Sequence, residues 1–318
     1  MKQNNESPFR MWSAFAWILG TVCMPLAIPW VVFNIVAAWK FKLFKNKLQG
    51  KVVLVTGASS GLGEALSHEF YKAGCRVILA SRRQDELKRV RECLLKIHKT
   101  QHIHPPVIIQ LDLSDTNSIP DFVNQALNIF GHVDILVNNA GVSYRGQIVT
   151  TGIDVDIKTM MVNYFGQVAL TKALLPSMIK NHSGHIVAVS SVQAKIAIPY
   201  RSAYAASKHA LQAFCDTLRA EVACHNVKVL VITAGYINTN LSLNAITGDG
   251  KTYGVLDETT AAGFSPEHVA REIVKNVVLE SKEITVSQLV PRIAIYLRTF
   301  APALYFWIMA RRAKKQQM

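Results

Sequence analysis

A tyrosine and a lysine one helical turn apart are the residues of this sequence best suited to acid–base chemistry. In YAASK (204–208), Tyr204 and Lys208 stand at positions i and i+4, on one face of a helix. A phenol with an ordinary pKa of about 10 is a poor base at neutral pH, but a neighbouring ammonium group favours its ionised form. We therefore predict that Lys208 lowers the pKa of Tyr204 and makes this tyrosine a proton donor and acceptor.

Ser191 adds a hydroxyl group that can hydrogen-bond the oxygen of a reacting carbonyl. It ends the apolar run HIVAVSS, thirteen residues before Tyr204. A tyrosine–lysine pair on its own is usually part of a solvated helix face. This pair follows the fifth predicted strand, with a glycine-rich loop upstream, and that position favours catalysis. Ser191 is thus predicted to be both catalytic and substrate-binding.

The glycine-rich loop TGASSGLG (56–63) directly follows the first predicted strand and opens the first predicted helix. Its glycines have the spacing GxxxGxG. Glycine lets the backbone turn tightly and approach a pyrophosphate, which the helix N-terminus then binds. The loop therefore predicts a dinucleotide site formed by Gly57, Ser59, Ser60, Gly61, Leu62 and Gly63.

The second predicted strand ends in Ser81, Arg82 and Arg83, in the sequence VILASRRQ. A site that prefers NAD would carry a carboxylate here, for the 2′-hydroxyl of the ribose. A guanidinium group can instead bind a 2′-phosphate through two hydrogen bonds. We predict NADP(H) in preference to NAD(H), with Arg82 as the contact. The alternative is a solvated pair of charges at the start of a helix.

Apolar strands that alternate with helices must position these residues. The predicted strands are residues 52–56, 76–80, 107–111, 133–137, 185–190, 227–232 and 283–287. The predicted helices are residues 62–72, 84–99, 116–130, 154–181, 203–225 and 266–281. Nearly continuous apolar strands indicate a parallel sheet that is covered on both faces. The predicted fold is α/β, with a doubly wound, Rossmann-type parallel sheet.

Composition and charge narrow the class of protein. Half of the 318 residues are hydrophobic and 18% are charged, which excludes a disordered chain. The five cysteines form no CxxC motif, so we expect no disulfide framework and no metal site. The net charge of +14 is concentrated at the ends, because residues 52–291 carry 22 basic and 20 acidic side chains. A nucleic-acid-binding protein would carry the charge on its folded body, so an anionic membrane surface is the expected partner.

The N-terminal flank predicts a membrane anchor. Residues 11–39 contain no charged side chain, and a span needs about 20 residues. Lysines follow this run more densely than basic residues precede it, which predicts a single span with the body in the cytosol. Three alternatives stay open: a hairpin bent at Pro25 and Pro29, a cleaved signal peptide, and a soluble structural helix.

The C-terminal flank is apolar, aromatic and basic, but Arg298 and Pro302 interrupt it. We predict a helix that lies in the membrane interface, and a helix packed on the body is the alternative. The expected organisation is an anchor with a basic linker (1–47), a catalytic domain (48–290) and a membrane-proximal tail (291–318).

Five motifs in this order resemble the short-chain dehydrogenase/reductase (SDR) family. They are TGASSGLG (56–63), NNAG (138–141), Asn163 in MVNYFG, Ser191 and YAASK (204–208). The resemblance covers residues 50–290. Ala234 departs from it, because the family usually has proline before the glycine at 235.

The resemblance implies a role for each matching residue. Asn163 distorts its helix and holds a water in a proton relay, Ser191 orients the carbonyl, and Tyr204 transfers the proton. Lys208 holds the nicotinamide ribose and tunes Tyr204. Asp112 and Asn139 line the adenosine side, and Thr239 touches the carboxamide. The remaining cofactor-binding residues that the resemblance adds are Leu113, Ala140, Gly141 and Tyr204.

More narrowly, stretches such as NYFGQVALTKALLPSMIK resemble the membrane-anchored member 7 group of the dehydrogenase/reductase SDR family, in its B-type branch. The resulting hypothesis is an NADP(H)-dependent carbonyl reductase or alcohol dehydrogenase for a lipid, retinoid or steroid-like substrate. Reduction of acyl- or alkyl-dihydroxyacetone phosphate is the alternative reaction, and a redox-silent NADP-binding membrane scaffold is the alternative class. The resemblance favours the endoplasmic reticulum or the peroxisomal membrane and is compatible with a homodimer.

Overall fold

The computed structural model describes residues 45–97 and 104–315, together with Gly20 and scattered residues between Ala27 and Trp39. The chain separates into two compact units, Met1–Lys45 and Asn46–Met318. Most of the predicted membrane segment, residues 11–39, lies outside the described residues. Within the described ranges, no helix is both long and apolar enough to cross a membrane.

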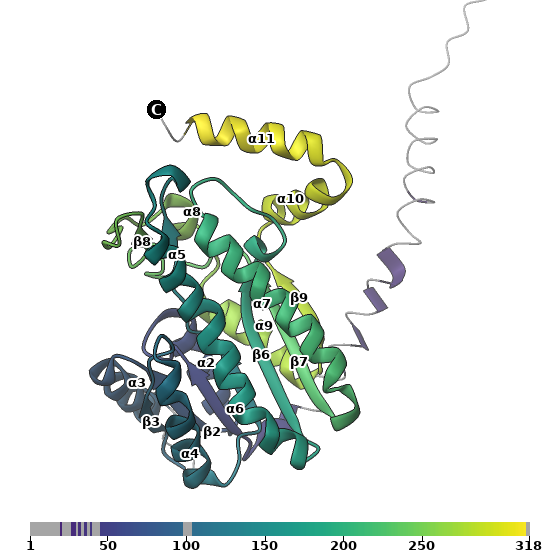
Figure 1. The fold of residues 1–318 in the computed structure, drawn as a ribbon. Coiled ribbons are helices and arrows are strands. Elements are labelled where there is room, and N and C mark those ends of the chain that lie inside the picture. The colour runs from purple at the N-terminus through teal and green to yellow at the C-terminus, as the bar shows by residue number, and fades with distance from the viewer. Residues whose placement is uncertain are drawn as a thin grey trace, which may run out of the picture. The chain divides into compact units, whose positions relative to one another are not determined.

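A seven-stranded parallel sheet forms the centre of the larger unit, in the order β3-β2-β1-β4-β6-β7-β9 (Figure 1). Its strands are β1 Val52–Thr56, β2 Arg76–Ser81, β3 Val107–Gln110, β4 Ile135–Asn138, β6 Gly184–Ser191, β7 Val227–Ala234 and β9 Glu283–Val286. Every residue of β1 is buried, because the strand lies between neighbours and is covered on both faces. The order reverses between β1 and β4, which is where doubly wound folds bind dinucleotides. The predicted α/β fold is confirmed.

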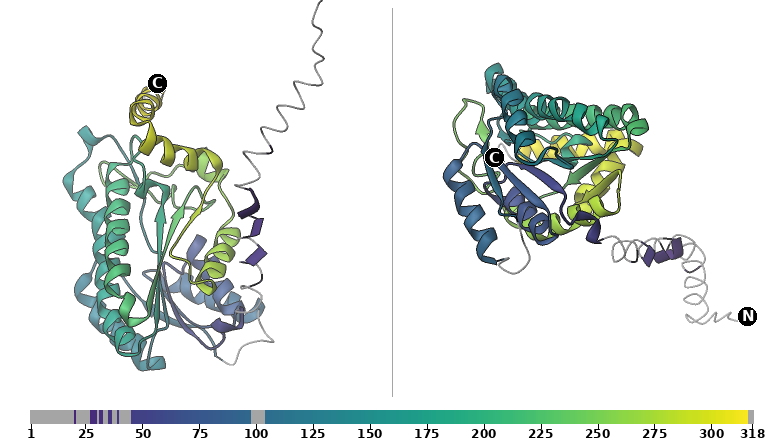
Figure 2. Two further views of the ribbon diagram at one scale, coloured as in Figure 1. Left: turned by 90° about the vertical axis from the view of Figure 1, so that its right-hand side faces the viewer. Right: turned by 90° about the horizontal axis from the view of Figure 1, so that it is seen from below.

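Six long helices cover the sheet, three on each face (Figure 2). One face carries α2 Gly61–Lys72, α3 Gln84–Ile97 and α9 Pro266–Val278. The other carries α4 Ile119–Phe130, α6 Gly166–Lys180 and α7 Ser202–Glu221. This arrangement follows from right-handed crossovers between parallel strands.

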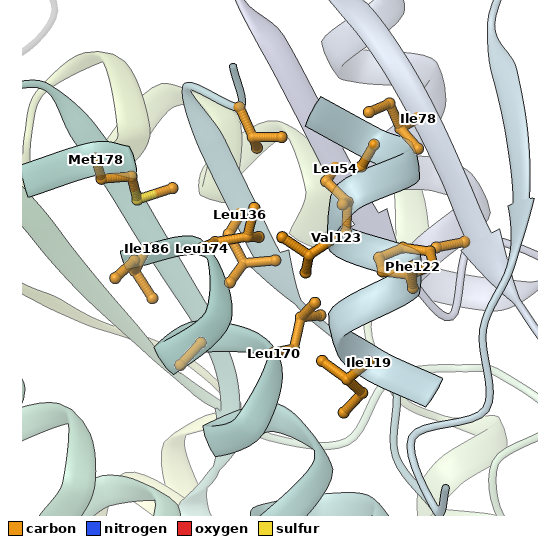
Figure 3. Packing of buried hydrophobic residues seen from close by; sticks show 14 of the residues in the cluster. Leu54, Ile78, Ile119, Phe122, Val123, Leu136, Leu170, Leu174, Met178 and Ile186 are labelled. Atoms are coloured by element: carbon orange, nitrogen blue, oxygen red, sulfur yellow. The ribbon is translucent and has the colours of Figure 1, made fainter. Parts of the chain in front are cut away.

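The core between the sheet and the second helical face is built from aliphatic side chains (Figure 3). Leu170 and Leu174 of α6 pack near Val123 of α4, against Leu136 of β4. All four are less than 5% exposed. Gly131 ends α4 in the left-handed conformation that glycine adopts readily, so the chain turns back into β4.

The helical region predicted over residues 154–181 is divided by a π-helical turn. Helix α5 Ile153–Met160 is followed by the turn η4 Met161–Phe165, and α6 then continues the same course. A π-turn widens the helix by one residue and changes the direction of the side chains around it. Asn163, at its centre, was expected to distort its helix, and the distortion is present.

Several shorter elements lie outside the predicted pattern. A small second sheet pairs β5 Tyr144–Arg145 with β8 Ile246–Thr247, and α8 Glu258–Ala261 follows in the segment without periodicity. The 3-10 helices are η1 Lys45–Leu48, η2 Thr116–Ser118, η3 Ile148–Thr150, η5 Val192–Ala194 and η6 Ala223–His225.

The C-terminal flank forms two helices, not the single helix expected from the sequence. Helix α10 Leu289–Phe300 ends at Ala301, and α11 Pro302–Lys315 begins with the proline, which cannot continue a helix from the preceding turn. The two helices cross steeply where the chain turns at Ala301. We call this pair the α10–α11 hairpin; it is drawn in yellow at the end of the molecule that also holds α8 and β8 (Figure 1).

Candidate active site

One cavity of about 1130 Å³ opens at the carboxyl ends of the strands and brings the predicted site residues together. Apart from Asn163, every predicted catalytic and cofactor-binding residue lines it. These residues are Gly57, Ser59, Ser60, Gly61, Leu62, Gly63, Arg82, Asp112, Leu113, Asn139, Ala140, Gly141, Ser191, Tyr204, Lys208 and Thr239. The cavity continues past Tyr204 to apolar side chains of α10 and α11.

The glycine-rich loop has the backbone geometry that a bound pyrophosphate requires. Gly57 and Gly61 have φ angles of +67° and +57°, a region that favours glycine. A Cβ on Gly63 would lie 2.1 Å from the Gly57 carbonyl oxygen, so only glycine lets α2 start so close to the loop. The N-terminus of α2, with its unpaired backbone N–H groups, faces the cavity. This cradle fits a dinucleotide phosphate.

We expect Gly63→Ala to damage the cofactor site and the fold together. The added methyl group must push the loop and α2 apart, and overpacking of this kind costs about 1–3 kcal/mol. Thermal denaturation with and without NADPH measures both effects, since a bound ligand stabilises the native state. An alanine variant with wild-type melting temperature and wild-type stabilisation by NADPH would contradict this account of the loop.

Thr56 ties the loop to the end of the neighbouring strand. Its Oγ1 accepts hydrogen bonds from the backbone N–H groups of Asn139 and Ala140, each at 3.0 Å. The Asn139 side chain returns a hydrogen bond from Nδ2 to the Thr56 carbonyl oxygen at 2.9 Å. The amide of Asn139 is therefore engaged with the backbone of β1, and its contribution at the cavity is to fix the cavity wall.

The two arginines after β2 differ in their contacts. Arg83 donates hydrogen bonds from Nη2 to Ser59 Oγ at 3.0 Å and to Ser60 Oγ at 2.7 Å. The guanidinium of Arg82 is exposed and donates no hydrogen bond to any described residue, although Arg82 also lines the cavity. Arg83 therefore braces the glycine-rich loop, and Arg82 is left available at the rim.

Asn163 lies behind the cavity wall, fully buried, with its amide group saturated by three hydrogen bonds. Its Nδ2 donates to the Val142 carbonyl at 2.9 Å and to Ser207 Oγ at 3.0 Å, and its Oδ1 accepts from the Val142 N–H at 2.8 Å. The side chain thus joins the segment after β4 to α7, the helix that carries Tyr204. Its geometry holds α7 in place.

Tyr204, Lys208 and Ser191 meet at the centre of the cavity. The Lys208 ammonium donates to the Val189 carbonyl at 2.9 Å and lies 5.8 Å from the centre of the Tyr204 ring. Ser191 Oγ accepts the Gln193 backbone N–H at 3.1 Å, and the serine lies near enough to the phenol to lower the pKa of Tyr204. The serine hydroxyl is therefore fixed beside the phenol, where a carbonyl oxygen could meet both groups.

Burial is the largest influence on the pKa values of Lys208 and Tyr204. It lowers the pKa of Lys208 from 10.5 to about 8. It also raises the pKa of Tyr204 above 10.0, against the opposing effects of Ser191 and Arg145. The prediction that Lys208 lowers the pKa of Tyr204 below its ordinary value is therefore wrong, since desolvation outweighs the nearby charges. A neutral phenol at physiological pH is a proton donor, the form that carbonyl reduction needs.

A cluster of two arginines and one aspartate, absent from the sequence prediction, also reaches this cavity. Arg145 pairs with Asp257 at 2.6 Å, and Arg201 contacts the same carboxylate at 3.3 Å. Both guanidinium groups line the cavity and are largely buried. Burial and the charge of Arg145 lower the pKa of Arg201 from 12.5 to about 10. Arg201 immediately precedes α7, the helix that carries Tyr204, and this position in the sequence could have identified it.

Two further polar atoms of the cavity wall were also missed. Ser190 Oγ and Gln193 Oε1 are buried and have no hydrogen-bond partner among the described residues. Both residues line the cavity close to Ser191 in sequence. A buried polar atom without a partner is costly, so these two atoms are available to a bound molecule.

The comparisons with known proteins identify the class to which this site belongs. The family model for short chain dehydrogenases matches residues 51–248. The chain therefore belongs to the short-chain dehydrogenase family and is an oxidoreductase.

The relatives agree with the narrower resemblance. A Drosophila melanogaster protein named dehydrogenase/reductase SDR family protein 7-like is 55% identical over 97% of this chain and 94% of its own length. A Xenopus tropicalis protein named dehydrogenase/reductase SDR family member 7B is 52% identical over 85% of this chain and 88% of its own length. The similarity to the member 7 and 7B group, predicted from the motifs, is confirmed.

Solved structures agree on the fold. A short-chain dehydrogenase from Streptomyces avermitilis is 29% identical, with a TM-score of 0.68 over 83% of this chain and 97% of that one. A metagenomic short-chain oxidoreductase, solved in complex with NADP, is 27% identical, with a TM-score of 0.61 over 75% of this chain and 97% of that one.

Proposed function

We propose that this protein is an NADP(H)-dependent carbonyl reductase or alcohol dehydrogenase that acts on a lipophilic ketone or alcohol. One observation carries the proposal: a single cavity joins the glycine-rich loop, the Tyr204–Ser191 pair and an apolar end lined by α10 and α11. The first part suits a dinucleotide, the second transfers a proton, and the third suits an apolar substrate.

Each side chain of the site would have its own role in carbonyl reduction. When bound, the nicotinamide supplies the hydride that reduces the carbonyl carbon. Ser191 donates a hydrogen bond that holds the carbonyl oxygen beside Tyr204, and Tyr204 gives that oxygen its phenolic proton. Lys208, cationic below a pH of about 8, stabilises the negative charge that then develops on the phenol. Alcohol oxidation runs the same steps in reverse.

The residues that would hold the cofactor follow from the shape of the cavity. The Gly57–Gly63 loop would bind the pyrophosphate, and Asp112, Leu113 and Asn139 form the wall beside it. Ala140 and Gly141 continue this wall toward Lys208, where a Cβ on Gly141 would lie 3.8 Å from Nζ. Thr239, which closely faces Gly61, completes the site from the opposite side. The NADP-bound relative is a precedent for the cofactor.

Arg82 is proposed to bind the 2′-phosphate, and Arg83 to brace the loop. A charged two-point contact is worth about 1.5–3 kcal/mol, so Arg82→Asp should weaken NADPH binding by roughly 10- to 150-fold and spare NADH. Arg83→Asp is the matched control, and it should weaken both cofactors because it disturbs Ser59 and Ser60. Titration of each variant with each cofactor gives the ratios. An unchanged NADPH/NADH ratio in Arg82→Asp would refute the assignment.

A second candidate reaction is supported by the arginine cluster. Arg145 and Arg201 share one carboxylate, so the cluster keeps an excess positive charge within the cavity. That charge would favour a ketone that carries a phosphate, as in the reduction of acyl- or alkyl-dihydroxyacetone phosphate. Comparing the turnover of a phosphorylated ketone with that of its dephosphorylated form would choose between the two candidates.

Membrane attachment is proposed from the sequence. Residues 1–47 would anchor the protein, residues 48–290 would form the catalytic domain, and residues 291–318 would lie near the membrane. The lysines after residue 39 support a cytosolic body at the endoplasmic reticulum or peroxisomal membrane. Protease protection on intact organelles tests this topology: a protected body would refute it.

A further inference from the structure

The hairpin of α10 and α11 is apolar both toward the cavity and toward solvent. On the inner side, Leu297 and Met309 line the cavity. On the outer side, Tyr296 is 66% exposed and Phe300 is 81% exposed. Large apolar side chains that are exposed side by side are normally covered by a partner or by lipid. No described element covers the outer side, so the hairpin presents an unusually apolar surface.

The charge of the hairpin indicates which surface it meets. Residues 289–315 contain no acidic side chain, and their basic residues are Arg292, Arg298, Arg311, Arg312, Lys314 and Lys315. Two of these guanidinium groups lie against aromatic rings, Arg298 at 4.8 Å from Phe306 and Arg311 at 3.8 Å from Trp307. Aromatic and basic side chains side by side are typical of segments that lie in the head-group layer of an anionic bilayer.

Three polar contacts between the hairpin and the body are found among the described residues. Arg292 of α10 donates to the Thr285 carbonyl at 2.8 Å, and the other two contacts are on the inner side of α11. Tyr305 is 2% exposed, and its hydroxyl donates to the Ala197 carbonyl. Tyr200 donates to the Ala313 carbonyl at 3.1 Å. These contacts fix the side of α11 that faces the cavity, which leaves Trp307 and the end of α10 facing outward. In Figure 2 the hairpin lies at one extreme of the body, where a flat surface could approach it.

We propose that the α10–α11 hairpin docks on an anionic lipid bilayer, with Tyr296, Phe300 and Trp307 inserted at the level of the head groups. The cavity then receives its substrate from the bilayer, between the two helices. The docking does not depend on the proposed function, whereas the delivery of substrate from the bilayer rests on it. It gives a lipophilic ketone a path to Tyr204 that avoids water.

A second copy of this chain fits the surface less well than a bilayer does. A symmetric contact would bring the same basic residues of two hairpins together with no acidic residue between them. Like charges at an interface are unfavourable, whereas anionic lipids neutralise them. A dimer is therefore an outcome that the experiment must distinguish from docking on a bilayer.

A spin label tests the docking in the full chain. We would place one nitroxide at Phe300→Cys, in a background with Cys23, Cys93 and Cys224 changed to serine. The matched control is Ile129→Cys, an exposed apolar position on α4, at the other end of the body. Because the label reports the depth of its own site, tethering of the chain by residues 1–47 does not affect the result.

With vesicles of phosphatidylcholine and phosphatidylserine, the Phe300 label should become accessible to oxygen and shielded from a water-soluble nickel chelate. The Ile129 label should stay accessible to the chelate. A Phe300 label as accessible to the chelate as the control would overturn the docking. Shielding from both reagents would also overturn it: spin–spin broadening would then identify a second copy, and its absence burial of the label within the chain itself.

A pair of substrates tests the path into the cavity. Burying one phenylalanine is worth about 1.5–3 kcal/mol, so Phe300→Glu should slow reduction of a long-chain ketone dissolved in vesicles by roughly 10- to 150-fold. Reduction of a short, water-soluble ketone should not change, and Ile129→Glu should affect neither. If Phe300→Glu reduced both ketones at the wild-type rates, the path would be refuted. If the wild type reduced neither ketone, the proposed function would fail, and the label would still decide the docking.

Discussion

Replacing Tyr204 by phenylalanine should lower the rate of ketone reduction by about 10²–10⁴-fold, the usual contribution of a general acid. The ring is kept, so the packing around this 9% exposed side chain should persist. Only the hydroxyl that faces Ser191 is lost. The measurement is the steady-state rate of NADPH oxidation with a saturating ketone.

Binding of NADPH is the control for this variant. Tyr204→Phe should bind NADPH within a few-fold of the wild type, because the glycine-rich loop is untouched. Ser191→Ala is a second control, and it should also slow reduction, since the substrate loses its orienting hydrogen bond. Turnover by Tyr204→Phe at nearly the wild-type rate would show that the proton comes from another group.

Lys208→Met should also abolish most of the activity, by about 10²-fold or more, because a preorganised charge is removed from the reacting centre. Methionine is an apolar side chain of similar length, so it should fill the same buried space. The loss should appear in kcat/KM for the ketone and in the affinity for NADPH. A variant with wild-type kinetics would remove Lys208 from the proposed mechanism.

The same substitution should change how stability depends on pH. In the folded chain, burial lowers the pKa of Lys208 from 10.5 to about 8, which corresponds to ~3 kcal/mol. Between these values the unfolded chain binds the proton more tightly, so this lysine makes the free energy of unfolding rise with pH. The buried ammonium is most destabilising below a pH of about 8, and its cost disappears toward 10.5.

The difference in unfolding free energy between Lys208→Met and the wild type isolates this effect, because other titrating groups are common to both proteins. Relative to the wild type, the variant should be most favoured below a pH of about 8 and should lose that advantage as the pH rises. The unpaired Val189 carbonyl adds a cost that does not depend on pH. A difference that stays constant from pH 7 to 10 in urea titrations would contradict the lowered pKa of Lys208.

Residue patterns alone predicted the sheet, because each central strand is a nearly continuous apolar run. The predicted strand over residues 52–56 coincides with β1, and the helix predicted over residues 62–72 begins one residue earlier, at Gly61. The π-turn around Asn163 has no periodic signal of its own. Only the family resemblance implied a distorted helix there.

The parts of the site that pattern reasoning missed depend on long-range contacts. Arg145 lies in the two-residue strand β5 and Asp257 immediately before α8, in segments without hydrophobic periodicity, and the fold alone brings them together. The pKa of Tyr204 was assigned the wrong direction because a sequence shows the neighbouring lysine but not the depth of burial. Arg82 and Arg83 are adjacent in sequence, and only the structure shows that Arg83 is engaged with Ser59 and Ser60.

Transfer of deuterium from labelled NADPH to a ketone tests the central claim most directly. The full chain in vesicles would be incubated with a long-chain ketone and with each C4-deuterated epimer of NADPH, and the alcohol analysed by mass spectrometry. The wild type should place deuterium on the carbinol carbon from one epimer only, and Tyr204→Phe should yield almost no labelled alcohol. A wild-type protein that binds NADPH but transfers no deuterium to lipophilic or phosphorylated ketones would contradict the account and favour a redox-silent binding protein.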